Sequence, residues 1–151
     1  MTATYPNHFS RSDKRQITME TSWKILVADR NPHIRKFLKR ELAAAGYNVW
    51  IAENAKELLK HVYGHKQINL LVLDPDFPGI DATDLHQKLA VQLPQLSVVL
   101  HGISRTDDHF DGAGNSVLRI EKNGSSVEIL KQTIRDILTD IDRSGHRPPT
   151  Q

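Results

Sequence analysis

The chain has 151 residues, a formal net charge of +2 with neutral histidines, and no cysteine. This length suits one domain with a full hydrophobic core, and the near balance of charges gives no case for a nucleic-acid partner. The absence of cysteine excludes disulfides, thiolate chemistry and cysteine-ligated zinc, and no apolar run approaches the ~18 residues that a membrane-spanning helix needs.

Both ends of the chain are polar. Residues 1–22 lack the apolar core of a secretory signal, and Pro148 and Pro149 interrupt regular structure near the C-terminus. We therefore expect a mobile N-terminal tail over residues 1–22, a single domain over residues 23–142, and a disordered C-terminal tail over residues 143–151. The simplest compartment for such a chain is the cytoplasm.

Between these ends, short apolar runs alternate with stretches of helical periodicity. Lys24–Ala28 (KILVA) is a continuous apolar run, as expected of a strand that is buried on both faces. Similar signals predict the other strands, at residues 47–51, 69–73, 96–100 and 117–120.

Four helices are predicted, one after each of the first, second, third and fifth strands. Asn31, followed by Pro32, predicts a helix start, and Gly46 predicts the end of the same helix. The other predicted N-caps are Asn54, Asp81 and Ser125. Two of them, Asn54 and Ser125, precede a glutamate by three positions, as in a capping box.

Strands that alternate with helices predict an α/β fold, in which a doubly wound parallel sheet carries helices on both faces. A helix is also due between the fourth and fifth strands, at Ile103–Asn115. That stretch is polar and contains two glycines, so we expect this fourth helix in the order of the fold to be weak or irregular.

Ionisable residues lie at the ends of four of the five predicted strands. Asp29 follows the first strand, Asp74 the third, His101 the fourth and Lys122 the fifth. Because the carboxyl ends of parallel strands meet at one edge of a sheet, where ligands bind, we expect these side chains to lie close together. One polar residue at a strand end is ordinary, since strands exit into loops, but four indicate a site.

Two carboxylates near one lysine suit a hard cation and a phosphoryl group. Mg²⁺ is usually held by one or two carboxylates together with phosphate oxygens and water. Asp74 begins the run DPDFPGID, and as a nucleophile it could form an acyl phosphate. Lys122 would then neutralise the transferred group.

The segments KILVADRNPHIR and LLVLDPDFPGID, with the later Lys122, resemble the receiver domain of bacterial two-component response regulators. The resemblance covers about Lys24 to Ile141, nearly the whole predicted domain. It implies a flavodoxin-like fold with the strand order 2-1-3-4-5. It also implies a role in a phosphorelay, with output through protein–protein binding and no enzyme activity.

The same resemblance implies roles for particular residues. Asp74 would be the phospho-acceptor, Lys122 would contact the phosphate, and His101 stands at the switch position. Asp29, Asp74 and Asp76 would form the metal site, with Mg²⁺ as the cofactor. The implied partners are a histidine kinase or phosphotransfer protein and a downstream protein target, with no role for nucleic acid or membrane. Beside the expected docking surface, the first helix carries a basic face, formed by Arg35, Lys36, Lys39 and Arg40.

Four residues depart from the family pattern. Arg30 replaces the second of two acids after the first strand, and a divalent ion ~5 Å from a guanidinium is repelled by roughly 6–7 kcal/mol at an effective dielectric of ~20. Pro75 has no N–H to hold phosphoryl oxygens, His101 replaces a small hydroxyl residue, and Asn123 replaces the usual proline. Arg30 either swings out or sits on a carboxylate in place of the cation. We therefore expect an atypical receiver whose phosphorylation is impaired, slow or absent.

Two other functions stay open. A pseudo-receiver would use the same fold as an interaction module without phosphate. Asp74-Pro75-Asp76 also resembles the D-x-D signature of haloacid-dehalogenase-type phosphatases, in which the second aspartate acts as general acid or base. However, Pro78 stands where that family has Thr or Val, and Asp107-Asp108 lie in a polar loop instead of at a strand end.

Overall fold

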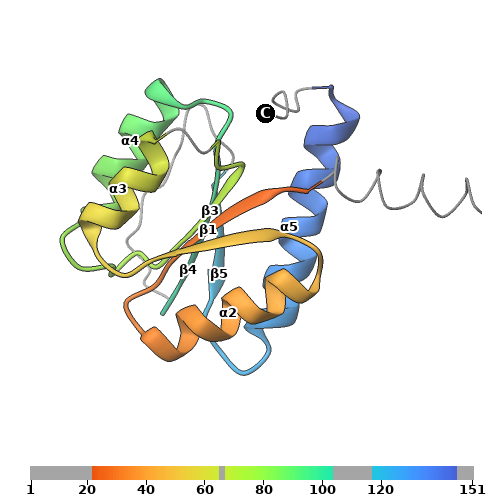
Figure 1. Ribbon diagram of the computed structural model, residues 1–151, viewed down its shortest axis with the longest axis horizontal. Helices are drawn as coiled ribbons and strands as arrows, with labels where there is room; N and C mark the ends of the chain where they lie inside the picture. The colour runs from red at the N-terminus through yellow and green to blue at the C-terminus, as the bar shows by residue number, and fades with distance from the viewer. Residues whose placement is uncertain (1–21, 65–66, 104–116, 146–151) are drawn as a thin grey trace, which may run out of the picture.

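The computed structural model describes residues 22–64, 67–103 and 117–145. These residues form a five-stranded parallel sheet with helices on both faces (Figure 1). The elements are β1 (Lys24–Ala28), α2 (Pro32–Ala44), β2 (Asn48–Ala52), α3 (Ala55–Tyr63), β3 (Leu70–Leu73), α4 (Ala82–Gln92), β4 (Ser97–Gly102), β5 (Val117–Glu121) and α5 (Ser126–Arg143). The strand order is β2-β1-β3-β4-β5, which confirms the predicted α/β, flavodoxin-like fold.

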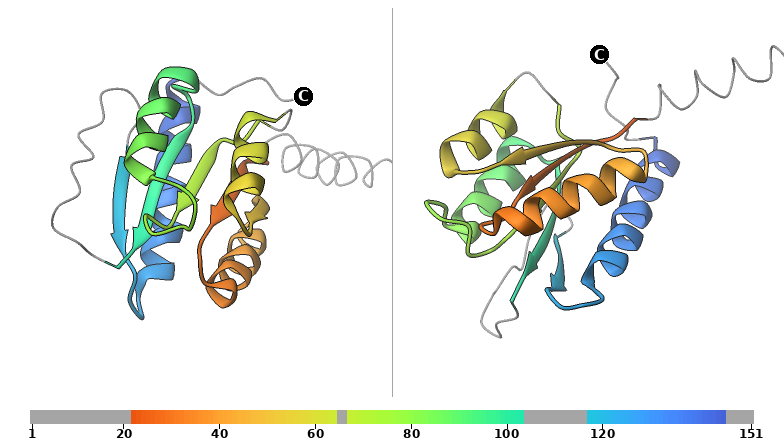
Figure 2. Two further views of the ribbon diagram at one scale, coloured as in Figure 1. Left: turned by 90° about the vertical axis from the view of Figure 1, so that its left-hand side faces the viewer. Right: turned by 60° about the horizontal axis from the view of Figure 1, so that its bottom comes forward.

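Two helices cover each face of the sheet, as Figures 1 and 2 show: α2 and α5 lie on one face, and α3 and α4 on the other. Successive strand residues point to opposite faces. Leu26 and Leu71 therefore pack under α3 and α4, whereas Ile25 and Leu70 pack under α2 and α5. Both β3 and β4 are buried along their whole length, which explains their continuous apolar runs.

The predicted helix starts at Asn31, Asn54 and Asp81 are confirmed. Each of these side chains accepts a hydrogen bond from a backbone N–H in the first helical turn, at 2.9, 2.9 and 3.0 Å respectively. Gly46 follows the end of α2 with a φ of 102°, a conformation that favours glycine. Because α2 begins immediately after β1, its cap also fixes the direction in which the chain leaves the sheet edge.

The start of α5 differs from the prediction. Ser125 occupies the N-cap position but makes no capping hydrogen bond, because its backbone is helical (φ −105°, ψ −2°) instead of extended. Asn123 holds the turn in its place. The Asn123 side chain accepts from the Ser125 N–H at 2.8 Å, and its carbonyl accepts from the Ser126 hydroxyl at 3.0 Å.

Strands β4 and β5 both run past their predicted ends. The pairs His101↔Ile120 and Gly102↔Glu121 continue the ladder beyond the apolar runs, because backbone hydrogen bonds do not depend on side-chain polarity. The weak helix predicted at Ile103–Asn115 lies almost wholly outside the described residues, as do most of the two predicted tails. Over the residues that the structure describes, no helix is both long and apolar enough to cross a membrane.

We expect truncation of Leu130 to Ala in α5 to lower the free energy of unfolding by about 2–5 kcal/mol, because it leaves a cavity in the core. Leu130 is 0% exposed, whereas its neighbour Ile129 is 49% exposed. Ile129→Ala is therefore the matched control and should cost less than about 1 kcal/mol. Urea denaturation measures both changes, and equal losses would contradict the packing of α5 on the sheet.

Candidate functional site

The carboxyl ends of β1, β3 and β5 bring two carboxylates and one ammonium group together. Asp29 and Asp74 directly follow Ala28 and Leu73, which are paired across β1 and β3. Lys122 follows β5, and its Nζ lies 2.8 Å from Asp29 Oδ2 and 3.2 Å from Asp74 Oδ2. The structure thus brings together three of the side chains that the sequence placed at this edge.

Both carboxylates are buried, with Asp29 2% and Asp74 1% exposed. An ionised carboxylate is stable in such a place only when it is paired and hydrogen-bonded. The backbone provides the hydrogen bonds: Asn31 N–H donates to Asp29 Oδ1, and Asp76 N–H donates to Asp74 Oδ1, each at 2.9 Å. Lys122 provides an opposite charge to both.

The loop after β3 directs Asp74 inward. The Asp74 carbonyl accepts a hydrogen bond from Phe77 N–H at 3.0 Å, which closes a tight turn. Phe77 is 2% exposed and packs in the core on the side of α3 and α4. The buried phenyl ring therefore anchors the loop, and the turn holds the carboxylate at the edge of the sheet.

Arg30 lies between Asp74 and Asp76. Its Nε is 3.4 Å from Asp74 Oδ2, and one terminal guanidinium nitrogen is 3.7 Å from Asp76 Oδ2. The Arg30 backbone N–H also approaches Asp74 Oδ2, at 3.3 Å. The side chain is 42% exposed, so water screens part of its charge. Of the two positions that the sequence left open for Arg30, the structure shows the one on the carboxylate.

Mg²⁺ does not fit this arrangement of side chains. A divalent cation needs free carboxylate oxygens, whereas Asp74 Oδ2 already faces Lys122 Nζ, Arg30 Nε and the Arg30 N–H. Within residues 22–64, 67–103 and 117–145, no three Asp, Glu or His side chains are grouped so as to hold a metal ion. Two cationic side chains of the protein, Lys122 and Arg30, therefore already contact the predicted metal ligands Asp29, Asp74 and Asp76.

Pro75 packs against Gly102 at the end of β4. A Cβ atom added to Gly102 would lie 2.5 Å from Pro75 Cδ and 2.6 Å from Pro75 Cγ, and 3.7 Å from Asp74 Oδ1. No side chain fits at position 102 unless the proline ring moves. Pro75 therefore removes a backbone donor next to Asp74, and its ring fills the space beside Gly102.

His101 is 2% exposed and connects β4 to the first turn of α5. Its Nε2 lies 3.0 Å from Ser126 Oγ, and the Ser126 hydroxyl donates to the Asn123 carbonyl at 3.0 Å. A hydroxyl group has one hydrogen, so Ser126 Oγ must accept from His101 Nε2. His101 therefore carries a proton on Nε2, and its Nδ1 has no hydrogen-bond partner among the described residues.

Burial lowers the pKa of His101 below its ordinary value of 6.5. The positive charge of Lys122 lowers this pKa further, while Asp29 and Asp74 act in the opposite direction. The hydrogen bonds place a proton on Nε2 and burial favours the uncharged ring, so His101 is the neutral Nε2–H tautomer. In this state His101 acts as a fixed link between two elements.

Two residues that hold the site were not predicted from the sequence. The predicted cap of the last helix is Ser125 and not Ser126, and Arg35 was expected on the basic face of the first helix. Arg35 is instead 9% exposed, and its Nη1 donates to the Asp29 carbonyl at 2.7 Å. A signal was available, because Arg35 and Ser126 share the helical spacing of the buried residues that follow them, such as Leu38 and Leu130.

Residues 25–132 match the family model of the response regulator receiver domain. The chain belongs to this family. As a receiver domain it is a non-enzymatic signalling module of two-component systems, as the sequence predicted. The haloacid-dehalogenase resemblance of Asp74-Pro75-Asp76 gains no support from this match.

Solved structures agree with the receiver fold. A CheY-like receiver domain protein from Methanospirillum hungatei JF-1 has a TM-score of 0.72 at 23% identity, over 82% of this chain and 98% of that chain. The response regulator TrrA from Thermotoga maritima, solved with Mg(2+)-BeF, has a TM-score of 0.66 at 26% identity, over 76% and 97% of the two chains. TrrA has also been solved in complex with the histidine kinase ThkA.

Curated relatives are much longer than this receiver. Sensor protein EvgS from Escherichia coli (strain K12) is 33% identical over 85 residues, which cover 56% of this chain and 7% of EvgS. The autoinducer sensor kinase/phosphatase CqsS from Vibrio cholerae is 29% identical over 118 residues, which cover 76% of this chain and 16% of CqsS. The receiver therefore spans only a small part of these relatives, and their other activities do not carry over to it.

We expect Ser126→Ala to lower the free energy of unfolding by about 1–3 kcal/mol, because the buried His101 Nε2–H would lose its acceptor. Ser125→Ala is the matched control, since Ser125 is exposed and its side chain makes no capping hydrogen bond. This control should change stability by no more than about 0.5 kcal/mol. Urea denaturation compares the two, and a Ser126 variant as stable as the Ser125 variant would refute the link.

The depressed pKa of His101 predicts a pH dependence of stability. The unfolded chain binds a proton at this histidine below its ordinary pKa of 6.5, whereas the folded protein resists protonation. Stability should therefore be complete above this pH and fall as the pH drops below it. His101→Gln keeps a donor for Ser126 but does not titrate, so its unfolding free energy should fall less between about pH 7.5 and pH 5. Parallel pH profiles for the two proteins would contradict this assignment.

Proposed function

We propose that this chain is a pseudo-receiver, which signals by binding proteins without phosphorylation of Asp74. The observation that supports this proposal is the pairing of the buried Asp74 carboxylate with Arg30 and Lys122. Lys122 and Arg30 place two positive charges against the buried carboxylates of Asp29 and Asp74, and Arg30 also contacts the exposed carboxylate of Asp76. The pocket therefore holds in its resting state the charges that a receiver otherwise obtains from Mg²⁺.

Arg30 opposes both steps that phosphorylation needs. Its positive charge repels a divalent cation, by roughly 6–7 kcal/mol at ~5 Å before its partial exposure to water reduces the figure. Its Nε also competes with an incoming phosphoryl group for Asp74 Oδ2. Pro75 adds to the effect, because it offers no N–H to a phosphoryl oxygen.

The proposed partners are a histidine kinase or phosphotransfer protein and a downstream target protein, in the cytoplasm. The complex of TrrA with ThkA supports a kinase partner for a related receiver. On this chain the exposed side of α2 carries Lys36, Lys39 and Arg40, and Arg40 lies 5.1 Å from the ring centre of Phe37. A positive surface with one exposed aromatic ring favours an acidic partner surface.

A phosphorylated receiver is the second candidate function. Lys122 Nζ lies 3.2 Å from Asp74 Oδ2, where it would stabilise charge on an incoming phosphoryl group. For this function Arg30 must leave Asp74. Its side chain is 42% exposed, which leaves it room to rotate into solvent.

The test is intact mass after incubation with acetyl phosphate and Mg²⁺. We expect no gain in the wild type and a gain of one phosphoryl group in Arg30→Asp, because that change removes the guanidinium and supplies a second acid after β1. A gain in the wild type that disappears in Asp74→Asn would overturn the proposal and support the phosphorylated receiver.

Mn²⁺ binding tests whether Arg30 keeps a divalent ion out of the site or only slows phosphorylation of Asp74. Paramagnetic broadening of the Asp76 backbone amide reports a divalent ion at this site. We expect Arg30→Asp to bind Mn²⁺ at least about a hundredfold more tightly than the wild type. Arg40→Asp makes the same charge change at a side chain on α2 that is 71% exposed, and should behave as the wild type. Equal affinities of wild type and Arg30→Asp would show that Arg30 does not exclude the metal.

A further inference from the structure

The loop between β5 and α5 contains the dipeptide Asn123-Gly124, and both residues are exposed. An asparagine side chain can react with its own main chain: the backbone nitrogen of the next residue attacks the side-chain carbonyl carbon, and a five-membered succinimide ring forms. Glycine at that next position favours the reaction, because it has no Cβ atom to obstruct the approach. Asn123 is also the one departure from the family pattern that the carboxylate site does not explain.

The nitrogen that would attack is not engaged in a hydrogen bond. Gly124 N–H has no partner among residues 22–64, 67–103 and 117–145, so no hydrogen bond has to break before this nitrogen reacts. A Cβ atom added to Gly124 would meet no heavy atom within 4 Å. Beyond its two chain neighbours, nothing therefore crowds the residue on that side.

The carboxamide of Asn123 is oriented by a hydrogen bond to its oxygen. Asn123 Oδ1 accepts from Ser125 N–H at 2.8 Å, and a backbone N–H can only donate, so the oxygen and nitrogen of the carboxamide are distinguished. Attack on the carbonyl carbon places negative charge on Oδ1, where this donor stabilises it. The Nδ2 amine that would leave has no hydrogen-bond partner in the part of the chain that the structure describes.

We propose that Asn123 is a site of spontaneous deamidation, which converts it to aspartate and isoaspartate. The Gly124 nitrogen loses its proton and forms a bond to Asn123 Cγ, while the bond from Cγ to Nδ2 breaks and ammonia leaves. Water then opens the succinimide ring. Attack of water at Cγ gives aspartate, and attack at the main-chain carbonyl carbon gives isoaspartate.

Both products alter the turn that joins Lys122 to α5. Each places a negative charge directly after Lys122. In isoaspartate the main chain runs through the side chain of residue 123, so the carbonyl that accepts from the Ser126 hydroxyl at 3.0 Å is no longer part of the main chain. Ser126 Oγ also lies 3.0 Å from His101 Nε2. Deamidation should therefore weaken the link between β4 and α5, slowly and irreversibly.

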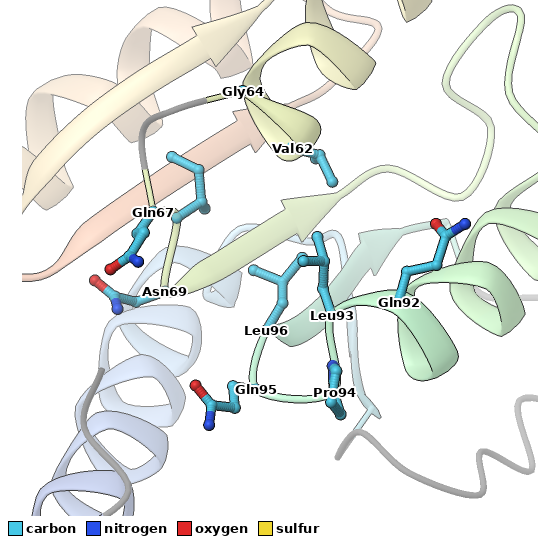
Figure 3. Close-up of a pocket in the computed structure, with 10 residues that line it drawn as sticks. Val62, Gly64, Gln67, Asn69, Gln92, Leu93, Pro94, Gln95 and Leu96 are labelled. Atoms are coloured by element: carbon cyan, nitrogen blue, oxygen red, sulfur yellow. The ribbon is translucent and has the colours of Figure 1, made fainter. Parts of the chain in front are cut away.

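The other asparagines that the structure describes differ from Asn123. Asn31 precedes Pro32, which has no N–H to react. Every other one precedes a residue that has a Cβ atom. Asn69, for example, lines the cavity shown in Figure 3 and precedes Leu70, which is 0% exposed. These asparagines serve as internal controls in the same sample.

Storage of the full chain for about four weeks at about 37 °C and about pH 8 tests the proposal, because asparagine is thermolabile. Digestion with a glutamate-specific protease in mildly acidic buffer then releases the peptide of residues 122–128. We expect this peptide to gain about 1 Da and to separate into an aspartate and an isoaspartate form. The conversion should be faster at about pH 8.5 than at about pH 6.5, because the nitrogen attacks as its anion. Absence of conversion, or equal conversion at Asn69, overturns the proposal.

Gly124→Ala is the decisive variant. Gly124 does not have a positive φ, and a Cβ atom fits there, so alanine should leave the fold unchanged. The added methyl group should slow the conversion of Asn123 at least about tenfold, because it obstructs the approach of the nitrogen. If Gly124→Ala keeps its folded spectrum and converts as fast as the wild type, the Gly124 nitrogen is not the nucleophile and the proposal fails.

Discussion

The burial of two carboxylates at one edge of the sheet is the constraint on which the rest of the site depends. Asp29 and Asp74 end adjacent strands, so their charges lie side by side where little water reaches them. Such a pair is stable only if cations and donors approach from every remaining direction. Lys122 comes from β5, two strands away from β3, and its N–H donates to the Gly102 carbonyl at 2.9 Å. The end of β4 therefore fixes the point from which the lysine reaches both carboxylates.

The departures from the family pattern act together around this pair. Arg30 contributes a second cation, Pro75 packs against Gly102 at the end of β4, and His101 joins β4 to α5 next to the turn that carries Lys122. Arg30 holds Asp74, Pro75 leaves no room for a side chain at Gly102, and His101 holds Ser126. A switch needs two states that differ by only a few kcal/mol. Three residues that all favour the same arrangement would widen this difference, which supports the proposal of a pseudo-receiver.

The sequence predicted the sheet well and the polar interactions less well. Lys24–Ala28 was predicted residue for residue, because a strand buried on both faces must be apolar throughout. Arg35 and Ser126 were missed, since the burial of a polar side chain depends on partners far away in the sequence. The position of Arg30 was equally beyond the sequence, because both candidate positions satisfy its charge.

Asp74 directly follows β3, a strand of four buried residues between two packed helical layers, which has little freedom to bend or slide. If the chain is the pseudo-receiver proposed above, this rigidity bears on output, because a packed pocket that already pairs its carboxylates with cations favours one state of the surface. A partner of such a receiver would recognise the composition of the exposed faces, such as the basic side of α2, more than a rearrangement that begins at the carboxylates.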